Sequence, residues 1–153
     1  MQNIKNQKMK RKLAKYKPGG YQLRVGRSSA GLGLFALEEI PKGVCLIEYF
    51  GRTISSAEEY TSRSKYLFEI NSRRTIDGQT RANRARYANH SCRPNAEAKI
   101  YRGRVFLMSR RKIKTGEEIT YDYGKTYWRE HIAPKGCRCV KCVPSQLKAK
   151  TVL

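Results

Sequence analysis

The sequence predicts a mainly β protein built as one compact domain, with few and short helices. Four segments, VCLIEYF, YLFEI, RVFLMSR and EITYDY, are rich in the β-branched and aromatic residues that favour strands. Turns are expected between them, and the last segment alternates well enough for a strand with one solvated face. A chain of 153 residues suits one such domain and is too short for a second full one.

Residues 1–20 are strongly basic and contain no acidic side chain; their cations are Lys5, Lys8, Lys10, Arg11, Lys12, Lys15 and Lys17. Mutual repulsion among these cations favours a disordered tail. A weak apolar stripe of Ile4, Met9, Leu13 and Tyr16 leaves a helix as the alternative. The Pro-Gly-Gly that follows would end such a helix.

Two short helices are expected within the rest of the chain. One begins at Ser55 or Ser56, where an acidic residue follows three positions later as a capping-box partner. The second lies in KTYWREHI, whose tryptophan and isoleucine share one helical face, and ends before Pro134.

The charge balance, 33 Lys and Arg against 12 Asp and Glu, gives a formal net charge of +21. Such a protein is expected to associate with polyanions such as DNA, RNA or nucleosomes; a solvated basic surface is the alternative. No apolar run is long enough to span a membrane, and the N-terminus lacks the apolar core of a signal peptide. We therefore expect an intracellular protein.

The cysteines favour a metal site over a disulfide framework. Cys137, Cys139 and Cys142 lie very close together in GCRCVKC, and the total of five is odd. Structural zinc prefers four ligands, so Cys92 in RYANHSCRPN is the expected fourth. The alternative is a self-contained site completed by one of the two histidines, His90 or His131. The remaining cysteine lies in an apolar strand and is expected to be a buried small hydrophobe.

Five motifs occur in a fixed order: GLGLF, IEYFG, RYANHSCRPN, GEEITYDYG and GCRCVKC. The short glycine and tyrosine motifs are weak singly, because Gly-x-Gly is most often a turn and strand tyrosines mostly pack. Together the five closely resemble the SET-domain protein-lysine methyltransferases, over about residues 21–143. The resemblance implies small curved β-sheets with a C-terminal pseudoknot, in which residues 89–95 and 118–123 cross and share one active site.

The resemblance also suggests a small stand-alone form of the family with a post-SET-like cysteine knuckle. The expected parts are a basic tail, the SET domain, the zinc knuckle and a polar C-terminal tail, at residues 1–20, 21–125, 126–143 and 144–153. The small size suits a bacterial, viral or minimal form, located in a bacterial or viral-host cytoplasm, or in a nucleus. The sequence departs from the family pattern where Ala82 replaces a usual glycine, and where two residues, instead of four, separate Cys139 from Cys142.

S-adenosylmethionine is the methyl donor that the resemblance implies, with S-adenosylhomocysteine as product. The two glycines of GLGLF would let the main chain approach the donor closely, since they lack a side chain. The asparagine and histidine of RYANHS match the cofactor-binding pair. The tryptophan of KTYWREHI or the residues flanking Cys139 are candidates to cover the adenine. The expected cofactor-binding residues are Gly31, Leu32, Gly33, Arg86, Tyr87, Asn89, His90 and Trp128.

Three tyrosines match the catalytic positions of the family. Tyr123 matches the catalytic tyrosine, whose hydroxyl helps to orient the amine and the methyl group. Tyr121 and Tyr49 match channel positions that set how many methyl groups fit, and two hydroxyls there predict a bias toward monomethylation. Tyr66 and Phe68 are further candidates for the channel wall, with ordinary core packing as the alternative.

The implied substrate is a lysine of a histone or of another DNA-associated basic protein. The basic surface would add contacts to DNA or nucleosomes. The competing hypothesis is a non-catalytic, zinc-containing module that binds nucleic acid or chromatin on a degenerate SET fold. The complete set of site residues favours the enzyme.

Overall fold

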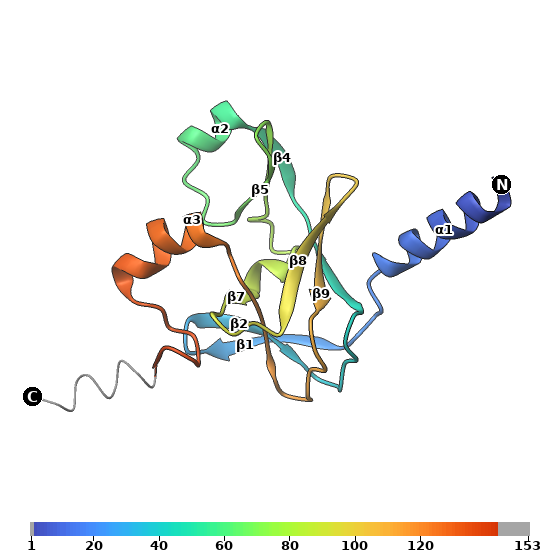
Figure 1. Ribbon diagram of the computed structural model, residues 1–153. Coiled ribbons are helices and arrows are strands. Elements are labelled where there is room, and N and C mark those ends of the chain that lie inside the picture. The colour runs from blue at the N-terminus through green and yellow to red at the C-terminus, as the bar shows by residue number, and fades with distance from the viewer. Residues whose placement is uncertain (1, 144–153) are drawn as a thin grey trace, which may run out of the picture.

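Three small sheets make up the body of the protein, as a computed structural model describes it for residues 2–143 (Figure 1). Apart from an N-terminal helix, the helices are short. The mainly β fold of small sheets is therefore confirmed. The expected polar tail over residues 144–153 lies outside the described residues.

The first sheet brings together the segments expected to form the site. Its strands run in the order β1 (Leu23–Ser28), β2 (Gly31–Ala36), β10 (Glu118–Tyr121) and β7 (Asn89–His90). β1 and β2 form an antiparallel hairpin, and β10 pairs antiparallel with β2. On its other edge β10 pairs parallel with β7, although the two strands are far apart in the sequence. The two segments that were expected to meet therefore lie side by side.

The other two sheets are three-stranded and antiparallel, with strand orders β3-β9-β8 and β4-β6-β5. The four segments predicted as strands form β3, β5, β9 and β10, so each prediction is confirmed. The bounds of these two sheets' strands are β3 (Cys45–Tyr49), β4 (Arg52–Ser55), β5 (Leu67–Asn71), β6 (Arg74–Asp77), β8 (Ala96–Tyr101) and β9 (Arg104–Ser109).

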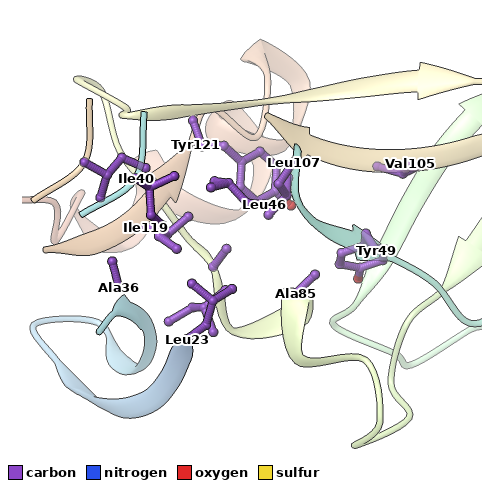
Figure 2. Packing of buried hydrophobic residues seen from close by; sticks show 14 of the residues in the cluster. Leu23, Ala36, Ile40, Leu46, Tyr49, Ala85, Val105, Leu107, Ile119 and Tyr121 are labelled. Atoms are coloured by element: carbon purple, nitrogen blue, oxygen red, sulfur yellow. The ribbon is translucent and has the colours of Figure 1, made fainter. Parts of the chain in front are cut away.

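One buried cluster joins the sheets (Figure 2). Leu34 of β2, Leu107 of β9 and Ile119 of β10 are fully buried in it. Tyr49 and Tyr121 belong to the same cluster, at 4% and 7% exposure. Because the rings of these two tyrosines are held by the core, their positions at the site are fixed by packing.

The other face of β9 packs a smaller cluster. Phe106 and Met108 alternate with the core residues along the strand and contact Cys45. Cys45 is 3% exposed, and burial together with the charge of nearby Glu48 raises the pKa of its thiol to about 11. Its prediction as a small buried hydrophobe is confirmed.

Helix α2 (Ser56–Thr61) begins where the capping box predicted. The Ser55 hydroxyl accepts the backbone N–H of Glu58 at 3.3 Å, and the Glu58 carboxylate accepts the backbone N–H of Ser55 at 3.0 Å. The helix predicted for KTYWREHI is also present. It consists of α3 (Lys125–Tyr127), a π-helical turn (Trp128–Ile132) and a 3₁₀ turn (Ala133–Lys135).

The N-terminal segment differs from the expected disorder, because helix α1 spans Gln2–Lys15 and projects from the body (Figure 1). Its Lys, Arg, Gln, Met, Leu and Ala residues are good helix formers, and this propensity opposes the charge repulsion. The residue after the helix, Tyr16, stacks on Tyr101 of β8 with ring centroids 4.4 Å apart. Within residues 2–143, no helix is long and apolar enough to cross a membrane.

Candidate active site

The pairing of β7 with β10 is reinforced by hydrogen bonds beyond the strands. Ser91 donates its backbone N–H to the carbonyl of Tyr121 at 3.1 Å. The side chain of Asn95, 2% exposed, donates to the Glu118 carbonyl at 2.7 Å and accepts from the backbone N–H of Thr120 at 2.9 Å. Asn95 was not identified from the sequence. Its place between a proline and the start of a strand was the feature that could have indicated a structural role. This asparagine fixes the register of the two remote segments.

Asn89 connects three pieces of the first sheet. Its amide nitrogen lies 2.8 Å from the Leu32 carbonyl, 2.8 Å from a Glu118 carboxylate oxygen and 3.1 Å from the Ser28 hydroxyl. Since an amide has two N–H groups, these contacts occupy its donors. The side-chain N–H groups expected to face the cofactor are thus bound by the protein itself. The side-chain oxygen of Asn89 is the polar atom that remains for a ligand.

The glycines of GLGLF have two different reasons to be glycine. Gly31 has a φ of 106°, a conformation that side chains rarely adopt. At Gly33 a Cβ would lie 2.5 Å from the Glu118 carboxylate and 3.0 Å from Ser28. The protein's own side chains therefore already require a glycine at position 33, and the close approach of a cofactor to this main chain stays a prediction.

A cavity of about 790 Å³ lies between β5 and α3. We call it the tyrosine pocket, after the side chains that line it: Tyr49, Tyr66, Tyr121, Tyr123 and Tyr127. Phe68 also lines it, so both predicted wall residues, Tyr66 and Phe68, lie at the pocket. Tyr127 was not predicted; it precedes the predicted Trp128 by one position and takes the inward place.

The aromatic rings of the pocket form a continuous wall. The rings of Tyr121 and Tyr123 have centroids 4.7 Å apart, and those of Tyr123 and Tyr127 are 5.1 Å apart. The Tyr49 ring lies 5.6 Å from that of Phe68. These are favourable aromatic separations, so the rings within each group stabilise one another's positions.

The hydroxyls of the pocket differ in their partners. Tyr49 donates to the Tyr66 carbonyl at 2.7 Å, and Tyr123 donates to the Ala88 carbonyl at 2.6 Å. Within residues 2–143, the hydroxyl of Tyr121 makes no hydrogen bond to another residue. Tyr121 lines the pocket, so this hydroxyl has unused capacity there to bind a polar group of a ligand.

Burial keeps these hydroxyls protonated. It raises the pKa of Tyr121, Tyr123 and Tyr49 far above the ordinary value, and neighbouring tyrosine and carboxylate groups add to the effect. At neutral pH the three therefore act as hydrogen-bond donors and acceptors and not as phenolate bases.

A smaller cavity of about 330 Å³ lies on the other side of the crossing segments. We call it the Asn89 pocket; its lining includes Asn89, His90, Glu118 and the segment 138–141. His90 and Tyr123, which line different pockets, contact each other with ring centroids 5.6 Å apart. The crossing thus forms a shared wall between two cavities.

His90 is held as a neutral ring. Its Nδ1 accepts the backbone N–H of Tyr123 at 3.2 Å, which requires an unprotonated Nδ1. Burial lowers the pKa of the imidazole, and the Asp122 carboxylate opposes this only in part. This arrangement agrees with a positioning role for His90 and gives it no free proton-accepting nitrogen toward the tyrosine pocket.

Arg86 reaches the tyrosine pocket over Tyr66, with its guanidinium carbon 4.5 Å from the ring centroid. One terminal nitrogen donates to the Tyr87 hydroxyl at 2.8 Å, and the other donates to the Gln79 carbonyl. Its Nε is buried and has no partner among the described residues. This donor is shielded by the surrounding protein, and Tyr87 itself lines neither pocket.

Three more predicted cofactor residues line neither cavity: Gly31, Leu32 and Gly33. They lie in β2 beside the Asn89 pocket, whose rim includes the preceding Ser29 and Ala30. The structure does not bring Trp128 to the site, because its side chain is 39% exposed and lines neither cavity.

Four cysteines converge beside the Asn89 pocket, as the sequence predicted: Cys92, Cys137, Cys139 and Cys142. Their sulfurs all lie within 4.8 Å of one another, and Cys92 Sγ is 3.8 Å from both Cys137 Sγ and Cys142 Sγ. Tetrahedral zinc with Zn–S bonds of about 2.3 Å places its sulfurs about 3.8 Å apart. The donor set therefore fits zinc, and neither histidine is needed.

Thiols of the cluster shift one another's ionisation in opposite directions: burial and hydrogen bonds with Cys142 and Cys137 raise the pKa of Cys92 to about 12. Burial opposes ionisation of Cys139, but hydrogen bonds from the Cys92 backbone and the Cys137 thiol outweigh it and lower its pKa to about 6. A thiolate is the form that binds metal. Ser29 donates its hydroxyl to the carbonyl of Arg138 at 2.8 Å, so the cysteine segment is also tied to the β1–β2 turn.

The structure therefore combines a four-stranded sheet with a parallel β7–β10 pair, two cavities beside that pair, and a four-cysteine cluster whose donor set fits zinc. The SET domain profile matches residues 31–124, so the chain belongs to the SET-domain family.

The relatives with the highest similarity include three named histone-lysine N-methyltransferases. Set-2 of Caenorhabditis elegans is 46% identical over 106 residues, which is 61% of this chain and 7% of that protein. Histone-lysine N-methyltransferase 2D of Homo sapiens is 34% identical over 125 residues, which cover 73% of this chain and 2% of that protein. A Chaetomium globosum enzyme described as H3 lysine-4 specific is 39% identical over 104 residues, 60% of this chain and 10% of its own.

Among solved structures, the fold resembles a protein described as "ctPRC2 in an autoinhibited conformation bound to S-adenosylmethionine". The TM-score is 0.62 at 30% identity, covering 68% of this chain and 15% of that one. The chain thus spans at most about a tenth of the length of the three relatives and less than a sixth of the solved chain.

Proposed function

We propose that the protein transfers a methyl group from S-adenosylmethionine to the side-chain amine of a protein lysine. The observation that most directly supports this is the β7–β10 crossing, which separates the tyrosine pocket from the Asn89 pocket by one shared wall. Two reactants that enter from opposite sides would meet at this wall. The names of the relatives and the methyl donor bound to the solved neighbour support the same reaction.

The methyl donor belongs in this proposal to the Asn89 side of the wall. Bound there, S-adenosylmethionine would supply an electrophilic methyl on a sulfonium sulfur. The side-chain carbonyl oxygen of Asn89, which accepts no hydrogen bond from the described residues, is a polar group of this pocket that fits such a ligand. The main chain at Gly31, Leu32 and Gly33 would border it, since Asn89 holds Leu32 in place.

The lysine belongs to the tyrosine pocket, where its amine must be uncharged to attack. With an ordinary pKa of about 10.4, neutralising the amine at pH 7 costs about 4.6 kcal/mol. A wall of buried aromatic rings disfavours the ammonium form by desolvation and so reduces this cost. The released proton leaves to water, because the protonated tyrosines are not bases.

Tyr123 has the central positioning role in this proposal. Its hydroxyl is fixed by the Ala88 carbonyl, its ring packs on Tyr121 and Tyr127, and its backbone is held by His90. A hydroxyl held this way can orient the amine lone pair toward the methyl carbon, which is where positioning contributes most to rate.

Zinc would be held by Cys92, Cys137, Cys139 and Cys142 and would have a structural role. It would cross-link the loop after β7 to the segment that borders the Asn89 pocket. We accordingly assign residues 21–125 to the SET domain and residues 126–143 to a post-SET-like knuckle.

Monomethyl-lysine is the product that we infer. The unpartnered Tyr121 hydroxyl would bind the amine or a water beside it, and together with the Tyr49 hydroxyl it would crowd a methylated product. Tyr121→Phe removes that hydroxyl and leaves room, so the product is expected to shift toward dimethyl-lysine in mass spectra. An unchanged methylation pattern would remove Tyr121 as the determinant; Tyr60→Phe, at a side chain 93% exposed, is the control.

The substrate we infer is a histone or another basic protein bound to DNA. With a histone substrate, the protein would act on chromatin in a nucleus. The histone methyltransferase names of the relatives support the substrate class, and the net charge of +21 supports proximity to DNA.

The proposal is tested by incorporation of labelled methyl from S-adenosylmethionine into nucleosomes, free histones and a panel of other basic proteins. Label on lysine of one of these substrates is the expected result. Absence of label from every substrate, with the donor in excess, would favour the non-catalytic chromatin-binding alternative.

A further inference from the structure

Helix α1 presents a basic face that the proposed reaction does not use. Lys5, Lys8, Lys12 and Lys15 follow one another at intervals of three or four, so they lie on one side of the helix. They span about 15 Å along the axis, at about 1.5 Å per residue. Every residue of the helix is exposed, and the helix projects away from the sheets (Figure 1).

These cations have no acidic partner in the described part of the chain. The ion pairs of residues 2–143 all involve side chains beyond position 38, and no acidic residue occurs before Glu38. The face therefore does not stabilise the fold through ion pairs, and its charge is available to a partner.

The helix is nevertheless attached firmly to the body. Tyr16 stacks on Tyr101 at 4.4 Å with the rings 11° from parallel, and it contacts Phe106 at 5.5 Å. Gly19 donates its backbone N–H to the carbonyl of Cys45 at 3.0 Å. Arg102, at the tip of the β8–β9 hairpin, lies with its guanidinium 5.5 Å from the Tyr101 ring centroid. The aromatic stack thus joins the basic helix to the hairpin.

We propose that α1 binds the phosphate backbone of duplex DNA without reading the base sequence. Duplex DNA supplies one negative charge about every 1.7 Å of axis, so a row of lysines along one helix face meets several phosphates at once. The inference goes beyond methyl transfer and does not depend on it. Its effect is to hold the tyrosine pocket close to lysines of proteins that lie on DNA.

An anionic membrane surface fits the helix less well. Insertion into an interface requires the apolar side chains on one face. Ile4 and Leu13 are nine positions apart, which is two and a half turns, so they lie on opposite sides. Met9 and Leu13, four positions apart, share one side, so the apolar face of the helix holds two of these three residues, whereas the basic face holds four lysines.

The test is the salt dependence of binding to a fluorescein-labelled duplex of mixed sequence, measured by anisotropy without any methyl donor. The variant changes Lys5, Lys8, Lys12 and Lys15 to Gln. Its affinity is expected to fall, and the slope of log K against log salt concentration to flatten by about 3.6, at about 0.9 for each lost phosphate contact. Replacement of the same lysines by Arg is expected to retain binding.

A matched control changes four exposed cations elsewhere to Gln: Arg73, Arg81, Arg110 and Lys114. It lowers the net charge equally and is expected to leave the slope nearly unchanged. Equal losses in both variants, no DNA binding by the parent, or tighter binding to phosphatidylserine vesicles than to DNA would each overturn the proposal. Transfer to free histones is expected to be the same for parent and α1 variant, so failure of this inference is distinguishable from failure of the proposed reaction.

Discussion

Tyr123→Phe is expected to reduce methyl transfer by about 10²-fold or more, the loss that follows when reacting groups are held slightly out of line. The hydroxyl it removes is anchored on the Ala88 carbonyl, at the wall between the two cavities. The ring contacts with Tyr121 and Tyr127 do not involve the hydroxyl, so they are retained in the variant. The fold is therefore expected to be unchanged.

The measurement is single-turnover transfer of labelled methyl, with affinity for S-adenosylmethionine determined in parallel. The donor affinity is expected to remain close to that of the parent, because Tyr123 lines the tyrosine pocket and not the Asn89 pocket. Tyr60→Phe controls for the loss of any tyrosine hydroxyl. A rate for Tyr123→Phe near that of the parent would remove Tyr123 from the mechanism.

Cys92→Ser is expected to abolish tight zinc binding. Cys92 is the one ligand that lies outside the C-terminal knuckle, and its sulfur is 3.8 Å from two of the other three. Structural zinc contributes an apparent free energy of about 10–16 kcal/mol in small peptide sites, so losing one ligand has a large effect. The wall of the Asn89 pocket formed by residues 138–141 would then separate from the body.

Metal analysis by mass spectrometry is expected to find one zinc ion per parent chain and much less in Cys92→Ser after dialysis against a chelator. Affinity for S-adenosylmethionine should fall with it. Cys45→Ala is the control, because Cys45 is buried in the separate cluster with Phe106 and Met108. Full zinc content in Cys92→Ser would show that the knuckle binds metal without the β7 loop.

Local signals in the sequence predicted much of this structure. The four strands follow from β-branched and aromatic content, and the start of α2 follows from a Ser-Glu pair whose side chains and backbone bond each other. The four cysteines were grouped by ligand chemistry, although the sequence does not show that Cys92 lies next to Cys137. In these cases the information was contained in a few neighbouring residues or in one known coordination number.

The structure differs from the sequence predictions where tertiary packing decides which of several similar residues occupies a position. Trp128 and Tyr127 are adjacent in the sequence, and the sequence alone does not show that Tyr127 is the one that packs on Tyr123 and lines the pocket. Gly33 is required by the Glu118 side chain, which comes from a strand far along the chain. The stacking of Tyr16, the residue after α1, on Tyr101 joins residues far apart in the sequence, and nothing near Tyr16 predicts it.

The central claim is that the β7–β10 crossing creates the site where the methyl donor binds. Titration calorimetry of S-adenosylmethionine against the parent protein and Asn89→Ala tests it most directly, with Asn71→Ala, at an exposed position of β5, as the control. The account predicts one binding site in the parent and in Asn71→Ala, and an affinity at least about tenfold weaker in a folded Asn89→Ala. The variant loses the side-chain oxygen that faces the pocket and the hydrogen bonds that hold the Leu32 main chain and Glu118 beside it. No binding to the parent, or equal affinity in all three proteins, would contradict it.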